Sequence, residues 1–184
     1  MEILGHYEEH PDGEKTLKLK LNHADLIRIW KRCGITADYA ANYASFSYTG
    51  VEGVENTAST ILNELIENAA KYSGGDKGDI EILITLKKDC IYFQVDNVLD
   101  ESHYGVFYEF AREMIQCRDV NSLYIEKIKA AAESGGEASG IGLLTILVNF
   151  SAGMGFKFTG EKGKKQYAVS VQASMPVRGE AVCS

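Results

Sequence analysis

Three side chains at helical spacing could carry out chemistry together. Glu64, Asn68 and Lys71 lie at i, i+4 and i+7, inside a segment from Glu55 to Tyr72 whose apolar residues recur at helical spacing. The segment predicts a helix with these three side chains along one edge of its buried face. A carboxylate there could accept a proton, an amide oxygen could bind Mg²⁺, and an ammonium group could neutralise phosphate. Alone, the spacing is more typical of a solvated helix face with one ion pair.

A glycine-containing run precedes a second predicted helix, Ile141–Phe150. Gly140 and Gly142 would let backbone N–H groups approach an anion that the helix dipole attracts. Ordinary close packing of the helix explains the same glycines, and a single Gly-x-Gly is weak evidence.

The tripeptide Val95-Asp96-Asn97 follows an alternating run and is interpreted as the end of a strand. An isolated carboxylate at the edge of a sheet could accept a hydrogen bond from an exocyclic amine such as that of adenine. A simple turn is the alternative, because Asp-Asn is a common turn pair.

Alternating apolar residues predict the strands that must position these groups. The expected strands are Thr16–Leu21, Asp79–Leu86, Cys90–Val95, Gly155–Thr159 and Gln166–Ala173. The first pair after the long helix is joined by a short lysine-containing turn, and the last pair by another. Strands and helices therefore occur in separate runs, which predicts an α+β, two-layer sandwich with a mixed or antiparallel sheet and helices on one face.

Two short helices are expected before the long one. Asn22 can cap a helix that ends at Gly34, and a second helix covers about Ala37 to Ser45. The second places Tyr39, Tyr43 and Phe46 on one face. We interpret this aromatic stripe as part of the core rather than as an interface, the alternative that such a stripe also permits.

The region from Asp100 to Glu133 predicts two polar-faced helices broken near Asp119, with a glycine-containing exit. Such an insert resembles a lid. The chain, 184 residues with 45% hydrophobic content, fits one domain over 1–184.

Composition excludes several classes of protein. The net charge of −7 argues against a nucleic-acid binder, because phosphate contacts need clustered Lys and Arg. The sequence lacks an apolar run long enough for a membrane span, and its acidic start differs from a signal peptide, so we expect a cytoplasmic protein without a membrane partner. The cysteines are scattered singly, which predicts a reducing compartment and no structural zinc.

The three candidate motifs resemble, in order, those of the GHKL (histidine-kinase-like) ATPase superfamily. NELIENAAKYS at 63–73 resembles its N-box, VDN at 95–97 a reduced first glycine box, and SGIGLLTI at 139–146 the second. The resemblance covers roughly 55–176, with 1–54 as an N-terminal strand and helices, and the lid would be about 98–138. One departure is that Val98 and Leu99 follow where the family usually has glycines.

The resemblance implies ATP and Mg²⁺ as cofactors. Residue by residue, it makes Glu64 the general base, Asn68 the metal ligand, Lys71 a phosphate contact and Tyr72 a neighbour of the adenine. It further makes Asp96 the acceptor of the adenine amine and places the nucleotide-binding residues Asn97, Gly140, Ile141, Gly142 and Leu143 around the base and phosphates.

The subgroup that fits best is the stand-alone one. No histidine lies on a dimerisation helix before the N-box, and the chain lacks the transducer domains of gyrase, Hsp90 or MutL. The run ADLIRIWKRCGITADYAANYASF is similar to SiaB-type regulators, which resemble anti-sigma-factor kinases. The expected function is a serine/threonine kinase acting on a small SiaC-like or antagonist-like partner protein in bacterial partner switching. The alternative is a nucleotide switch that sequesters its partner without efficient transfer, and a homodimer is compatible with either.

Overall fold

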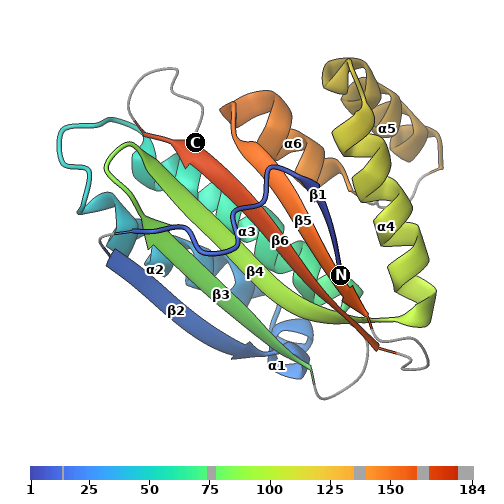
Figure 1. The fold of residues 1–184 in the computed structure, drawn as a ribbon, viewed down its shortest axis with the longest axis horizontal. Coiled ribbons are helices and arrows are strands. Elements are labelled where there is room, and N and C mark those ends of the chain that lie inside the picture. The colour runs from blue at the N-terminus through green and yellow to red at the C-terminus, as the bar shows by residue number, and fades with distance from the viewer. Residues whose placement is uncertain (14, 74–77, 135–139, 161–165, 178–184) are drawn as a thin grey trace.

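A six-stranded sheet, antiparallel throughout, forms one layer of a two-layer α/β sandwich in the computed structural model, which describes residues 1–13, 15–73, 78–134, 140–160 and 166–177 (Figure 1). The strand order is β1-β5-β6-β4-β3-β2. The strands are β1 (Glu2–Gly5), β2 (Lys15–Asn22), β3 (Asp79–Leu86), β4 (Cys90–Asp100), β5 (Gly153–Gly160) and β6 (Gln166–Pro176). The α+β class and the antiparallel sheet are as the sequence predicts.

The helices are α1 (His23–Arg28), α2 (Lys31–Ser45), α3 (Val54–Tyr72), α4 (Glu101–Gln116), α5 (Val120–Ser134) and α6 (Ile141–Phe150). Helices α2, α3 and α6 lie behind the sheet in the view of Figure 1, while α4 and α5 lie toward its β1–β5 side. In the described part of the chain every helix is too short or too polar to cross a bilayer.

Helix α3 forms the centre of the helical layer because its apolar positions are continuous. Its buried side chains, which include Ile61, Leu62, Leu65 and Ile66, pack against the inward side chains of the sheet and against α2 and α6. Inward positions of the strands alternate with outward ones, as in β4, where Phe93, Val95, Asn97 and Leu99 face the helices. The long helix and its apolar face are therefore confirmed.

Two predictions about the N-terminal helices are wrong. Asn22 does cap α1, accepting a hydrogen bond from the Asp25 nitrogen at 3.2 Å, but α1 ends at Arg28 and Gly34 lies inside α2. The buried face of α2 consists of Cys33 and the alanines Ala37, Ala40, Ala41 and Ala44. The aromatic side chains of this helix face solvent instead, because small side chains allow α2 to lie close against α3.

The region after β4 forms two helices, α4 and α5, with the break near Asp119 as expected. Asp119 accepts a hydrogen bond from the Ser122 nitrogen at 3.1 Å at the start of α5. Helix α4 packs on the sheet through Phe107, Ala111 and Met114. The expected glycine exit and the lysine turn before β6 lie outside the described residues.

The chain between β1 and β2 crosses the helix-free face of the sheet (Figure 1). We call residues 6–13 the strap. Gln172 of β6 holds the strap backbone by two hydrogen bonds with Glu8, and the Tyr7 hydroxyl bonds Ser170 at 2.8 Å. The strap therefore connects the two edge strands of the sheet, β1 and β2. The sequence did not predict β1.

Among the described residues, Cys33 and Cys117 are free thiols. Burial raises the pKa of the Cys33 thiol to about 11, so this cysteine is a structural residue rather than a reactive one.

Candidate functional site

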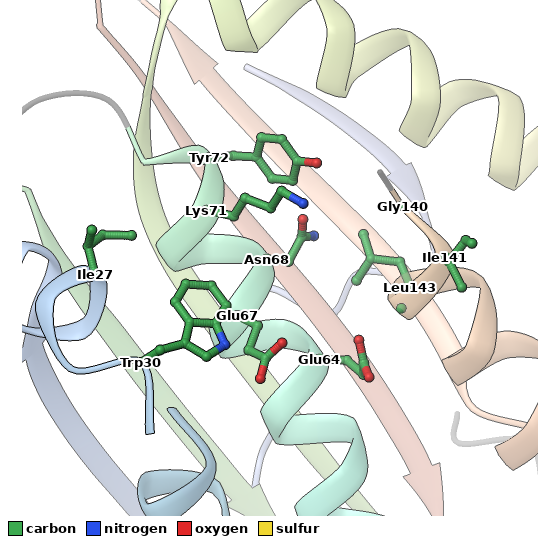
Figure 2. Close-up of a pocket in the computed structure, with 11 residues that line it drawn as sticks. Ile27, Trp30, Glu64, Glu67, Asn68, Lys71, Tyr72, Gly140, Ile141 and Leu143 are labelled. Atoms are coloured by element: carbon green, nitrogen blue, oxygen red, sulfur yellow. The ribbon is translucent and has the colours of Figure 1, made fainter. Parts of the chain in front are cut away.

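A cavity of about 700 Å³ lies between the C-terminal half of α3 and the first turn of α6 (Figure 2). Its lining joins eight of the predicted site residues with three that were not predicted. The lining residues are Ile27, Trp30, Glu64, Glu67, Asn68, Lys71, Tyr72, Gly140, Ile141, Gly142 and Leu143. Segments more than sixty residues apart in sequence therefore form one site, in a volume typical of small-molecule pockets.

Helix α3 supplies the polar wall of the cavity. Glu64, Asn68 and Lys71 project from successive turns of the helix into the space in front of α6 (Figure 2). Their i, i+4, i+7 spacing places them on one edge of the helix, and the buried stripe next to them fixes that edge toward α6. The structure thus brings together the three side chains that the sequence singled out.

The first turn of α6 supplies the opposite wall. Gly140 caps the helix with φ of +85°, a left-handed conformation that glycine adopts without strain. A Cβ atom at Gly142 would overlap the Glu64 carboxylate, so a larger residue there would displace the Glu64 side chain from its position. Backbone N–H groups at the start of a helix attract anions, and here they border a cavity with a lysine.

Glu64 has the electrostatics of a proton acceptor. Burial raises its pKa above the usual 4.5, and the negative charge of Glu67 one turn later raises it further. A carboxylate whose pKa is raised is a stronger base than one with the ordinary value. This combination of partial burial and a nearby like charge is common at functional sites.

Glu67 is the acidic residue that the sequence interpretation missed. It lines the cavity and accepts a hydrogen bond from the Asn63 amide at 2.9 Å. Its position three residues after Glu64, on the same edge of α3, was the available signal. Ile27 and Trp30 also line the cavity, at the junction of α1 and α2, where no pattern in the sequence pointed to them.

A smaller cavity of about 90 Å³ adjoins the first and is mostly aromatic. It shares Asn68, Tyr72 and Gly140 with the larger cavity, and α4 contributes its other lining residues, His103, Val106, Phe107 and Phe110. The Tyr72 ring stacks on Phe107 with centroids 6.3 Å apart and meets His103 edge-on at 6.1 Å. Helix α4 of the predicted lid therefore closes one end of the site with flat apolar surfaces.

Asp96 does not lie in this site, which corrects the prediction that it joins Glu64 and Asn68. Strand β4 continues through it to Asp100, so Asp96 points to the helix-free face, where Gln94 and Ser170 donate hydrogen bonds to it. The side chains of a strand alternate between faces, and an interpretation that ended the strand at Val95 could not assign that face. Asp96 there lines a separate cavity of about 390 Å³ beneath Tyr7 of the strap.

Asn97 occupies the helix-facing position beside Asp96. Its side chain is 6% exposed, and its amide nitrogen lies 3.1 Å from the Ser73 Oγ and 3.5 Å from the Ala69 carbonyl oxygen. These bonds join β4 to the end of α3, one residue after Tyr72. Of the two adjacent polar residues, Asn97 is the one on the side of the sheet where the cavity lies.

The site offers one amide and two carboxylates as oxygen ligands for a hard cation. In the residues that the structure describes, no group of three His, Cys, Asp or Glu side chains gathers to hold a metal ion. Mg²⁺ that is bound together with phosphates needs only one or two protein oxygens, and Asn68 with Glu64 or Glu67 meets that requirement. A self-sufficient protein cage, of the kind that zinc or calcium occupies, is not what these residues form.

Comparison with known proteins identifies no relative: neither a protein-family model nor a curated protein matches this chain.

Proposed function

We propose that the chain binds ATP with Mg²⁺ in the larger cavity and transfers the γ-phosphoryl group to a serine or threonine hydroxyl of a small partner protein. The observation that carries the proposal is the convergence of Glu64, Asn68 and Lys71 on the first turn of α6. A base, an oxygen ligand, a cation and a helix N-terminus are the parts that phosphoryl transfer requires.

Each part has a distinct role in the proposal. The backbone around Gly140 and Gly142 receives the phosphates, and Lys71 neutralises their charge. Asn68 would provide a protein oxygen for Mg²⁺, which would supply positive charge to offset the negative charge that develops on the phosphate. The aromatic cavity of Tyr72 and Phe107 offers flat surfaces against which a purine base can stack.

Glu64 accepts the proton in the proposed reaction. As the hydroxyl oxygen of the partner forms its bond to the γ-phosphorus, the bond from that phosphorus to the β,γ-bridging oxygen breaks and ADP leaves. The hydroxyl proton passes to the Glu64 carboxylate. The raised pKa of Glu64 suits this step, and positioning by the helices supplies most of the acceleration.

The resemblance to GHKL proteins supports the same reading. The N-box-like run contains Glu64, Asn68 and Lys71, the second glycine box contains Gly140 and Gly142, and both border one cavity. An antiparallel sheet covered by helices on one face agrees with that fold. In the first box, Asn97 rather than Asp96 faces the helices, and its contact with Ser73 leads us to propose that Asn97 positions the end of α3 that contains Tyr72.

The alternative is a nucleotide switch that sequesters its partner and turns over ATP slowly or not at all. Val98 and Leu99 favour it, because they replace glycines of the first box and Leu99 is buried in the core. A lid packed through such side chains has less freedom to close over phosphates. The partner, rather than phosphoryl transfer, would then read out the bound nucleotide.

Calorimetry with ATP, with and without Mg²⁺, tests the binding step, and γ-labelled ATP with candidate small partner proteins tests transfer. Mg²⁺-dependent binding with label on a partner serine or threonine is the expected result. Binding of both ATP and a partner without transfer would support the switch. No binding of ATP at millimolar concentration would overturn both.

A further inference from the structure

The outer face of α2 presents a line of large apolar side chains to solvent. The exposed fractions are 57% for Ile35, 59% for Tyr39, 43% for Tyr43 and 74% for Phe46. We call these four residues together with Arg32 the α2 stripe. Within the described part of the chain nothing covers them, although isolated exposed apolar residues are normal and a continuous line of them is not.

The intervals between residues of the α2 stripe form the same series when read from either end of the helix. Positions 32, 35, 39, 43 and 46 are separated by three, four, four and three residues, so Tyr39 lies at the midpoint. At 100° per residue all five lie within about 80° of one another on the helix surface. A second α2 lying antiparallel on the first would therefore pair Arg32 with Phe46, Ile35 with Tyr43, and Tyr39 with itself.

We propose that this stripe is an interface between two copies of the chain, related by a two-fold axis that passes beside Tyr39. A two-fold interface requires that a residue i that contacts j is matched by j contacting i, and the palindromic spacing satisfies this condition with complementary chemistry. Binding of a different protein would not require the intervals between the stripe residues to be palindromic.

The end pairs join a cation to an aromatic ring. Arg32 forms an ion pair with Asp25 at 2.8 Å and keeps its side chain 45% exposed at the start of the stripe. In the antiparallel arrangement the planar face of the guanidinium lies over the ring of the partner subunit's Phe46, the cation–π geometry that arginine prefers. A parallel arrangement would instead bring the two Arg32 charges together.

The interface would adjoin the nucleotide cavity. Trp30, 41% exposed, lines that cavity and precedes the stripe by two residues at the start of α2. Each copy would therefore have its cavity near the end of the shared helix pair. The dimer does not depend on nucleotide, so its test stands whether or not the proposed kinase activity is found.

Sedimentation of the full chain over a range of concentrations tests the interface. We expect a monomer–dimer equilibrium with Kd on the order of 10 µM, because one helix per copy buries a small area. Tyr39→Glu should weaken it at least about tenfold, since two carboxylates would face each other. The matched control is Ile125→Glu on α5, a residue 51% exposed, which should leave the equilibrium unchanged.

Cysteine cross-linking tests the register. In a Cys117→Ser background, Tyr39→Cys should form a disulfide-linked dimer by itself, and Ile35→Cys should link to Tyr43→Cys only when the two variants are mixed. The background chain without the introduced cysteine is the blank. A chain monomeric up to about 100 µM, a dimer insensitive to Tyr39→Glu, or cross-links in another register would each overturn the proposal.

Discussion

At the scale of single residues, Glu64 combines a cost in stability with a gain in chemistry. Burial and the neighbouring Glu67 raise its pKa in the folded protein above 4.5. Its contribution to stability is therefore complete below the unfolded pKa and is lost as the pH rises through the folded pKa. At pH 7 the charged form is held in an unfavourable environment, as is typical of residues kept for function.

Glu64→Gln should therefore abolish phosphoryl transfer while leaving ATP affinity within about threefold and Tm equal or slightly higher at pH 7. The amide removes the proton acceptor and the buried charge but keeps the shape. Calorimetry, labelled transfer and thermal unfolding measure the three quantities. Transfer at the parent rate would exclude Glu64 as the base.

Glu67→Gln separates electrostatics from direct catalysis. Removing its charge lowers the pKa of Glu64, so the acid limb of the pH–rate profile, expected above pH 4.5 in the parent, should move to lower pH. The maximal rate should change far less than in Glu64→Gln. An unchanged acid limb would show that Glu64 does not govern it, and a rate as low as that of Glu64→Gln would assign Glu67 a direct role.

Asp96 and Asn97 are adjacent in β4, so their side chains lie on opposite faces of the sheet. Asn97→Ala should weaken ATP binding and cost about 0.5–1.5 kcal/mol of stability, because it removes the hydrogen bonds by which the buried Asn97 amide holds the end of α3. Asp96→Asn should leave ATP affinity unchanged, since its side chain lies on the other face of the sheet. Calorimetry on both variants checks this, and the reverse outcome would restore Asp96 to the nucleotide site.

At the scale of helices and strands, the sequence predicted the elements with regular apolar periodicity. It did not predict which helix face packs against another helix. The strand Asp79–Leu86 and the helix Ile141–Phe150 have the predicted bounds, because their apolar periodicity is uninterrupted. The aromatic stripe of α2 was assigned to the core because aromatic side chains usually are buried. Which face of α2 packs on α3 was decided instead by the fit of small alanines, a property of the helix pair and not of α2 alone.

At the contact between α6 and α3, Gly142 has no Cβ atom and so leaves room for the Glu64 carboxylate. Gly142→Ala should lower the rate of phosphoryl transfer at least about tenfold, because the added Cβ displaces the Glu64 carboxylate, while ATP affinity should stay within about threefold. The control is Gly105→Ala on α4, where a Cβ meets open space within the described structure and alanine favours the helix. Labelled transfer compares the two variants, and equal rates would mean that the displaced Glu64 still reaches the reacting hydroxyl.

At the scale of the whole molecule, the two faces of the sheet contact different parts of the chain. The helix-facing side borders the candidate nucleotide site, whereas the other side holds the strap by polar contacts, including ion pairs of Glu8 with Lys87 and of Glu9 with Lys157. Those contacts are partly exposed and individually weak. Neither the strap nor β1 was predicted, because four extended residues pairing with a strand 150 residues later have no local signature.

The strap reaches the sheet because β5 has no side chain at one outward position. A Cβ at Gly155 would lie 2.6 Å from the Tyr7 nitrogen and overlap the His6 carbonyl, so the backbone of the strap occupies the place of a side chain. Gly155→Ala should push the strap off β5 and cost about 1–3 kcal/mol, as overpacking does, which lowers Tm by about 2–10 °C for a chain of this size. ATP affinity should stay close to the parent value, because the cavity lies on the opposite face.

Thermal unfolding measures the change in Tm, and calorimetry measures the ATP affinity. The control is Gly105→Ala, which should keep or raise Tm. A variant with parent Tm would mean that the strap contributes nothing to stability, and lost ATP affinity with Tm retained would mean that the two faces of the sheet are coupled.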